Sequence, residues 1–231
     1  MSSKIKVDTI ENVAGSGNVS LGSGHNLVVP GTSTLTGGVL TNTLNTASGT
    51  TITVPTGKQL VVTDTGGLKV PGTVIQVVNA EKTDTASSST TVPTFTDVGL
   101  SCTITPKFST SKILVHVNAA LGVDTSVFNQ MRVVRNIAGG SFSIVSAADS
   151  AGSRTAAHAS VYDGDNEGMI TLQTFIHLDS PSTTSAVIYK VQLGNSGGSG
   201  AIYINRSGRD NDSAAYDVRA SSRIVLQEIA Q

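Results

Sequence analysis

Apolar and polar residues alternate along much of residues 76–231, and this pattern predicts short β-strands. Residues 113–117 carry isoleucine or valine at every second position, and residues 187–193 carry valine, tyrosine, valine and leucine in the same way. This two-residue period is typical of a strand with one face in a core. Clusters of Gly, Ser, Asp and Asn separate most of the segments. Nine or ten strands are therefore expected, with candidates at 74–79, 95–105, 111–121, 128–137, 141–147, 156–162, 168–178, 184–193, 200–206 and 217–229.

The segment 168–178 shows the alternation with an apolar and a polar face. Its apolar face carries Ile170, Leu172, Ile176 and Leu178. Its polar face carries Thr171, Gln173 and His177. Many short strands joined by turn residues predict a β-sandwich or jelly-roll-like head. At its length this head can bury roughly 70% of its unfolded surface, so we expect it to be a self-sufficient globular unit.

Residues 14–75 contain two copies of a 33-residue repeat. The segment GHNLVV at 24–29 returns as GKQLVV at 57–62, and the same offset pairs Leu35 with Leu68. Each copy has only aliphatic apolar residues, so other chains must cover its open faces. We expect an intertwined β shaft in a closed cyclic oligomer, and a trimer suits this geometry. The alternative is a disordered linker, which would need neither the register nor the alternation.

Composition supports an all-β chain and excludes several classes of function. Ser and Thr together make up about a quarter of the 231 residues, aromatic residues are 4% and Trp is absent. A net charge of −1 argues against nucleic-acid binding through phosphate neutralisation. The longest apolar stretch, 113–123, is interrupted and too short to cross a bilayer, so we expect no membrane insertion. The N-terminus has no apolar signal-peptide region, so we expect synthesis in the cytoplasm.

No constellation of residues predicts catalysis, a metal site or a cofactor. The four histidines, at 25, 116, 158 and 177, lack metal-ligand spacing. Cys102 lies in an alternating segment and is expected to be a buried thiol. The acidic segments 163–167 and 209–213 are interpreted as solvated turns, with cation binding as the alternative. We therefore expect the protein not to be an enzyme.

Binding through loops remains a possible function, because the loops of a β-sandwich can carry specificity while its sheets stay constant. The candidate loops are 122–127, 138–140, 149–155, 163–167, 194–200 and 207–216. Aromatic residues at loop borders can stack on sugars or contact a protein, although many such residues only pack at strand ends. The candidate receptor contacts are Tyr162, Asp163, Asp165, Arg209, Asp210 and Tyr216.

Several segments, in order along the chain, resemble fibre proteins of tailed bacteriophages, especially marine phages of cyanobacteria. The opening IKVDTIEN at 5–12 is similar to their N-termini, and NLVVPG at 26–31 to the segment that follows. The head contributes the segments VIQVV at 74–78, FTDV at 95–98, TITP at 103–106, SKILV at 111–115 and SSRIVLQEI at 221–229. Residues 123–216 carry little of the likeness.

The resemblance implies a homotrimeric virion fibre or short tail fibre on the exterior of the particle. Residues 1–13 would attach to other virion proteins, with Ile5, Val7, Ile10 and Val13 as candidate contacts. Residues 14–75 would form the shaft, and residues 76–231 would face a glycan or protein of the host surface. Because the chain is short for a tail fibre, a capsid decoration, head fibre or cement protein is the alternative. A polysaccharide-degrading spike would need paired carboxylates in a groove, which the sequence does not predict.

Overall fold

The computed structural model describes residues 54, 56–124, 127–149, 151–162, 167–197, 200–213 and 215–231. The chain divides into two compact units, residues 1–59 and residues 60–231, and the account below concerns the second. The first copy of the repeat and the candidate attachment residues Ile5, Val7, Ile10 and Val13 lie outside the described residues.

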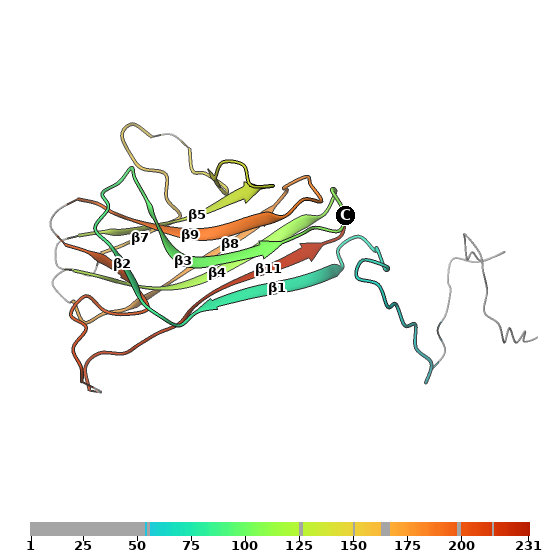
Figure 1. Ribbon diagram of the computed structural model, residues 1–231, viewed down its shortest axis with the longest axis horizontal. Helices are drawn as coiled ribbons and strands as arrows, with labels where there is room; N and C mark the ends of the chain where they lie inside the picture. The colour runs from blue at the N-terminus through green and yellow to red at the C-terminus, as the bar shows by residue number, and fades with distance from the viewer. Residues whose placement is uncertain are drawn as a thin grey trace, which may run out of the picture. The chain divides into compact units, whose positions relative to one another are not determined.

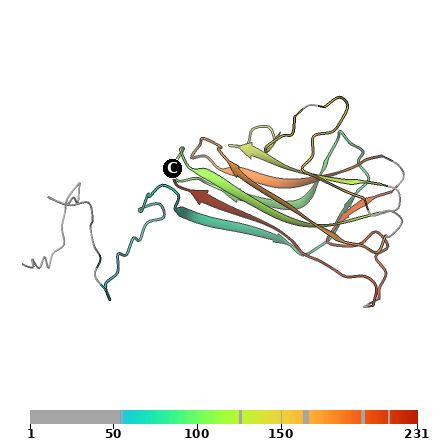
Figure 2. The same cartoon turned by 180° about the vertical axis from the view of Figure 1, so that it is seen from behind.

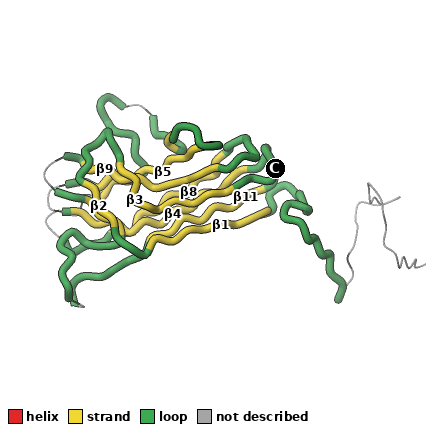
Figure 3. Tube along the Cα trace, viewed as in Figure 1, coloured by secondary structure: helices red, strands yellow, loops and turns green. Residues whose placement is uncertain are grey.

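The described residues form strands and loops without any helix, as Figure 3 shows by colour. This confirms the all-β prediction for that part of the chain. A strand overlaps each of the ten expected segments, and the short strand β2 was not expected. The strands are β1 (Val74–Lys82), β2 (Ala86–Ser88), β3 (Thr96–Ile104), β4 (Lys112–Val123), β5 (Asn129–Ile137), β6 (Ser143–Ile144), β7 (Ala159–Val161), β8 (Thr171–Asp179), β9 (Val187–Asn195), β10 (Ile202–Ile204) and β11 (Ser222–Ile229).

Two antiparallel sheets form the two layers of a sandwich (Figure 1). In the first sheet β4 pairs with β8 on one side, and with β11 and then β10 on the other. Leu121 shows this arrangement, because it pairs with Ile204 of β10 and with Thr171 of β8. Beyond β11 and β10 lie β1 and β2, so β8 is the opposite edge of the sheet. The second sheet has the order β3–β9–β5, with β6 and β7 both pairing with β5.

The apolar core lies between the inner faces of the two sheets. From the first sheet, β4 contributes Ile113, Val115 and Val117, all of which are fully buried. From the second sheet, β9 contributes the alternating residues of 187–193 in the same way. Each such side chain contributes roughly 1.5–3 kcal/mol when it leaves water, so this core is the main source of the head's stability.

β8 buries the face opposite to the aliphatic one, although its apolar alternation suggests that the aliphatic face should be buried. Phe175 and Asp179 are buried on the inner face of the strand. Leu172, Ile176 and Leu178 lie on the outer face and are 60%, 61% and 44% exposed. Successive residues of a strand point to opposite faces, so burying the odd-numbered residues forces the three aliphatic ones outward.

A polar bridge between the sheets explains why the odd-numbered face of β8 is buried. The carboxylate of Asp179 accepts hydrogen bonds from the guanidinium of Arg135 on β5 and, at 2.7 Å, from the hydroxyl of Tyr189 on β9. Burial, and then the bond to Asp179, raise the pKa of Tyr189, so this hydroxyl stays protonated as a donor. A buried carboxylate needs such partners, and both lie on the other sheet.

Asn205 is a buried hydrogen-bonding centre at the point where β10 gives way to a loop. Its side-chain amide donates to the backbone carbonyls of Lys82 and Asp84, both at 2.8 Å. Its side-chain oxygen accepts a bond of 2.6 Å from Ser222, whose hydroxyl in turn accepts one from the backbone N–H of Ala120. Asn205 has a φ of +66°, a conformation that asparagine tolerates better than most residues. It therefore links β1, β4 and β11 at the place where the partner of β4 changes from β11 to β10.

Replacement of Asn205 by aspartate should destabilise the head. Asn205→Asp keeps the shape and the tolerance of positive φ, but it cannot donate to the two carbonyls and places a charge against them. We expect the free energy of unfolding to fall by about 2–4 kcal/mol, measured by urea denaturation. Asn211→Asp, at an exposed loop position, is the matched control and should change it little. Equal stability of the two variants would contradict the role assigned to Asn205.

Candidate functional site

The sandwich has two different ends, which fix where a binding site can lie. At the root end β1 begins and β11 ends, and the chain arrives there through bonds of 2.9 Å from Gly72 N–H to the carbonyl of Ala230 and from Ala230 N–H to the carbonyl of Thr73. At the opposite end, here called the loop end, β4 and β9 finish and β11 begins. Figure 2 shows the same two ends from behind, with the C-terminus at the root end.

Four of the six candidate loops connect strands at the loop end. They are 122–127, 163–167, 194–200 and 207–216, of which residues 125–126, 163–166, 198–199 and 214 lie outside the described residues. The candidates Asp163 and Asp165 are among these. The loop 138–140 lies at the root end, and the loop 149–155 lies along the side of the second sheet. The pairing of the strands therefore brings loops that are distant in sequence to the same end of the sandwich.

An exposed aromatic pair marks the loop end. The rings of Phe128 and Tyr162 stack with their centroids 4.5 Å apart and their planes inclined by 23°. Both side chains are almost half exposed, at 43% and 49%. Phe128 is held in place by Ser196, whose hydroxyl accepts from the Phe128 N–H at 2.9 Å and whose own N–H donates to the Phe128 carbonyl. The exposed face of such a pair suits the apolar face of a sugar ring or an apolar side chain.

A hydrogen-bonded charge cluster organises the loop that follows β10. The guanidinium of Arg209 donates to both oxygens of Asp217, at 3.0 and 3.2 Å, and the hydroxyl of Ser207 donates to one of them at 2.9 Å. The bond from Arg209 lowers the pKa of Asp217 despite the opposing effect of burial, so the carboxylate remains ionised. Asp210 pairs with Arg219 at 2.8 Å. The carboxylates of this cluster therefore already have cationic partners.

The structure shows three of the predicted receptor contacts in one loop, and a fourth, Tyr162, at the same end of the sandwich. Arg209, Asp210 and Tyr216 share the loop between β10 and β11, and the ring of Tyr216 is 70% exposed. The backbone N–H of Arg209 donates to the carbonyl of Glu167 at 2.9 Å, which joins this loop to the one that begins at Tyr162. Sequence reasoning missed Phe128 and Asp217. An aromatic residue beside the candidate loop 122–127 was the signal for the first, and the second fell within an expected strand.

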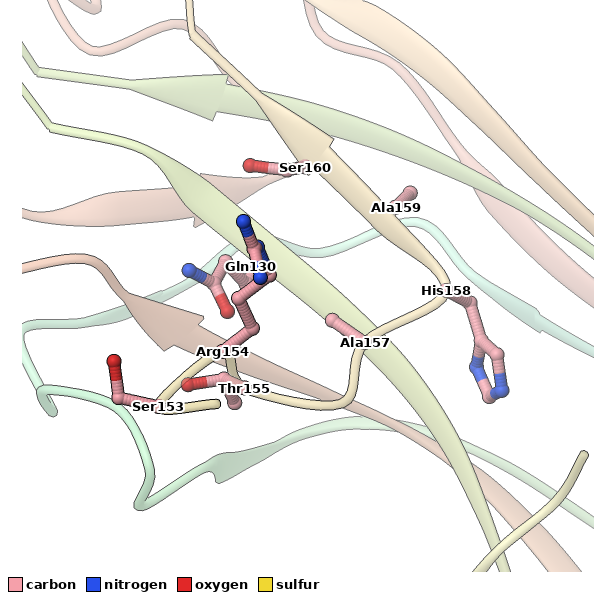
Figure 4. A pocket seen from close by; sticks show the side chains of 8 residues that line it. All are labelled: Gln130, Ser153, Arg154, Thr155, Ala157, His158, Ala159 and Ser160. Atoms are coloured by element: carbon pink, nitrogen blue, oxygen red, sulfur yellow. The ribbon is translucent and has the colours of Figure 1, made fainter. Parts of the chain in front are cut away.

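A hollow of about 590 Å³ lies on the side of the second sheet, open to solvent (Figure 4). Its wall has polar side chains from Gln130 of β5, from Ser160 of β7 and from Arg154 in the loop before β7. The imidazole of His158 points away from these side chains in Figure 4. Among the described residues that line the hollow there is no carboxylate, and the imidazole of His158 points away from the polar wall, so none of them is placed to act as a general base on a ligand there.

His158 completes the edge of β5 in the gap between β6 and β7. Its Nδ1 accepts the backbone N–H of Val133 at 2.9 Å, so its Nε2 carries the proton and donates to the carbonyl of Val145 at 2.6 Å. Its ring also packs on Phe175 of β8, with centroids 4.3 Å apart. Burial lowers the pKa of His158 more than the bond to Val145 raises it. His158 is thus a neutral structural residue.

The other histidines of the head and the cysteine also lie where they cannot form a catalytic or metal-binding group together. His116 pairs with Ile176 and His177 pairs with Val115, so the two histidines lie on opposite faces of the sheet. Cys102 is buried, as expected, and burial raises the pKa of its thiol. Among the described residues no three His, Cys, Asp or Glu side chains gather as a metal site would require. A helix of the length and apolarity needed to cross a membrane is likewise not found in that part of the chain.

Comparison with known proteins yields distant structural similarities. No protein-family model and no curated protein matches the sequence. A structure of infectious bursal disease virus, Gx strain, is 12% identical with a TM-score of 0.36, covering 68% of this chain and 37% of that one. The VP2 subviral particle of the same virus is 11% identical with a TM-score of 0.35, covering 68% and 38%. The chain spans about two fifths of the length of these proteins, and similarity at this level assigns neither a family nor a function.

The neutral state of His158 predicts a loss of stability at mildly acidic pH. The unfolded chain binds a proton at this residue near pH 6.5, whereas the folded chain resists it, so the free energy of unfolding should fall as the pH drops below about 6.5. His158→Gln can accept from Val133 and donate to Val145 without titrating. Urea denaturation at pH 7.5 and pH 5.0 should show a smaller loss for this variant than for the natural protein. Equal losses would contradict a neutral buried imidazole.

Proposed function

We propose that this chain is a structural protein of a bacteriophage virion, a homotrimeric fibre that displays its β-sandwich head for attachment to the host surface. Its N-terminal segment attaches to other virion proteins, and its loop end binds a glycan or protein of the host. The observation that carries the proposal is the polarity of the head. The chain arrives at the root end, and the exposed Phe128–Tyr162 pair lies at the opposite end. The sequence resemblance to phage fibres supports the same orientation.

The loop end is suited to weak, repeated binding rather than to catalysis. The aromatic pair offers an apolar stacking surface, and Arg209 and Tyr216 lie on a loop whose backbone is held by its own ion pairs. Stacking on an aromatic side chain contributes about 0.5–1.5 kcal/mol, which is weak for a single head. Three heads on one fibre, and several fibres on one particle, convert such weak sites into firm attachment.

Loss of the aromatic pair should slow adsorption of particles to host cells. For phage carrying Phe128→Ala or Tyr162→Ala we expect adsorption roughly tenfold slower or more, since each particle loses the contact at every head. Phe142→Ala is the matched control, because Phe142 is an exposed phenylalanine of the same head that follows the root-end turn 138–140. Its variant should adsorb at the natural rate. Adsorption equally fast in all three variants, with the heads folded by circular dichroism, would overturn the attachment role.

Removal of the whole chain distinguishes attachment from the cement alternative. Particles that lack the protein should adsorb poorly and keep their resistance to heat, because a fibre does not hold the shell together. The measurement is the surviving fraction of particles after heating, with adsorption scored on the same preparation. Normal adsorption combined with a loss of heat resistance would instead assign the protein as a capsid cement.

A further inference from the structure

The outer faces of the two sheets differ in chemistry. On the second sheet, polar side chains cross the surface in one hydrogen-bonded chain. Arg132 donates to Gln192 at 2.8 Å, Gln192 donates to Asp97 at 2.6 Å, and Lys190 donates to Asp97 at 2.5 Å. These groups satisfy one another and stay in water, as expected of a solvent-facing sheet. The outer face over β8 and β4 carries a shorter polar group, in which Thr174 donates to Asn118 at 2.7 Å and Asn118 lies 3.5 Å from the imidazole of His116, with aliphatic side chains on either side of it.

Aliphatic side chains gather on the outer face of the first sheet. The ladder places Leu114 of β4 beside Leu178, and Ile176 lies between Leu178 and Leu172 along β8. Towards the other edge the same face carries Val225 of β11 and Val77 of β1, which is 53% exposed. We call the residues Leu114, Leu172, Ile176 and Leu178 the aliphatic face. The hydrogen-bonded pair of Thr174 and Asn118 lies between Leu172 and Ile176. Exposed aliphatic side chains gathered in this way mark an interaction site.

The edge of β8 is also open. Among the described residues, its backbone pairs only with β4, and its first eight residues contain no charge and no proline. Exposed edge strands are normally guarded by a lysine, a proline or a bulge, because an unguarded edge invites pairing with another chain. A long edge that is both uncharged and aliphatic on its outer face is therefore suited to being covered in the working protein.

We propose that a second copy of this chain covers the aliphatic face. The charges on the outer face of the first sheet favour this occupant. Glu81 and Arg223 pair with each other at 2.9 Å, and Lys112 stands at the root-end margin. A surface that packs against its own copy meets its own charges, so a face without excess charge at its centre suits self-association. The proposal rests on the proposed function only in requiring more than one copy, and its test does not use adsorption.

Thiol labelling of the full-length protein tests whether the aliphatic face is covered. Thr174 is exposed between Leu172 and Ile176 in the monomer, so Thr174→Cys places a reporter in the face. The natural Cys102 is buried and contributes little background. Val218→Cys, at a loop position that is 64% exposed, is the control for a free thiol. We expect maleimide to label Thr174→Cys roughly tenfold more slowly than Val218→Cys, followed by mass spectrometry.

A second substitution identifies what covers the face. Ile176→Lys sets lysines of adjoining copies against each other, so in the Thr174→Cys background it should restore labelling to the rate of the control. Val218→Lys in the same background adds the same charge elsewhere and should leave labelling slow. Equal rates for Thr174→Cys and Val218→Cys would overturn the proposal. Slow labelling that Ile176→Lys does not relieve would overturn it as well, because the cover would then not be a second copy at this face.

Discussion

The bridge from Asp179 to Arg135 and Tyr189 is the constraint on which the arrangement of the head depends. It joins β8 of the first sheet to two strands of the second, and its carboxylate is nearly buried. A carboxylate so placed cannot turn to the outer face without leaving two polar groups unpaired. Because the side-chain period of a strand is two, this one residue fixes the facing of the whole of β8. The inward position of Phe175 agrees with it.

The exposed aliphatic residues of β8 follow from the same constraint. With Asp179 and Phe175 inside, Leu172, Ile176 and Leu178 have only the outer face left. Cover by a second copy, as proposed above, would account for the difference between this face and the polar outer face of the second sheet. The loop end is a separate surface, so covering β8 leaves the candidate binding site free.

Local sequence patterns predicted the strands well, because alternation and turn residues act over a few positions. The short β2 was missed since Ala86–Ser88 has no apolar alternation. The last strand was expected to begin at 217, but Asp217 and Arg219 belong to the ion pairs of the preceding loop, and β11 begins at Ser222. The facing of β8 could not be read from its sequence, because the partners that decide it lie on other strands. The pairing of Phe128 with Tyr162 was hidden for the same reason.

The candidate site is positioned by the closeness of its loop to the central strand of the first sheet. A side chain at Gly122 of β4 would place its Cβ 2.3 Å from the carbonyl oxygen of Arg206, and one at Gly208 would lie 2.3 Å from that of Val123. No side chain fits at such distances, so the loop crosses β4 only because both positions are glycine. Asn205 holds one end of the loop, and the ion pairs of Asp217 and Arg219 hold the other. A loop held at both ends presents Arg209 and Tyr216 from a fixed base, which allows its exposed side chains to change without disturbing the sheets.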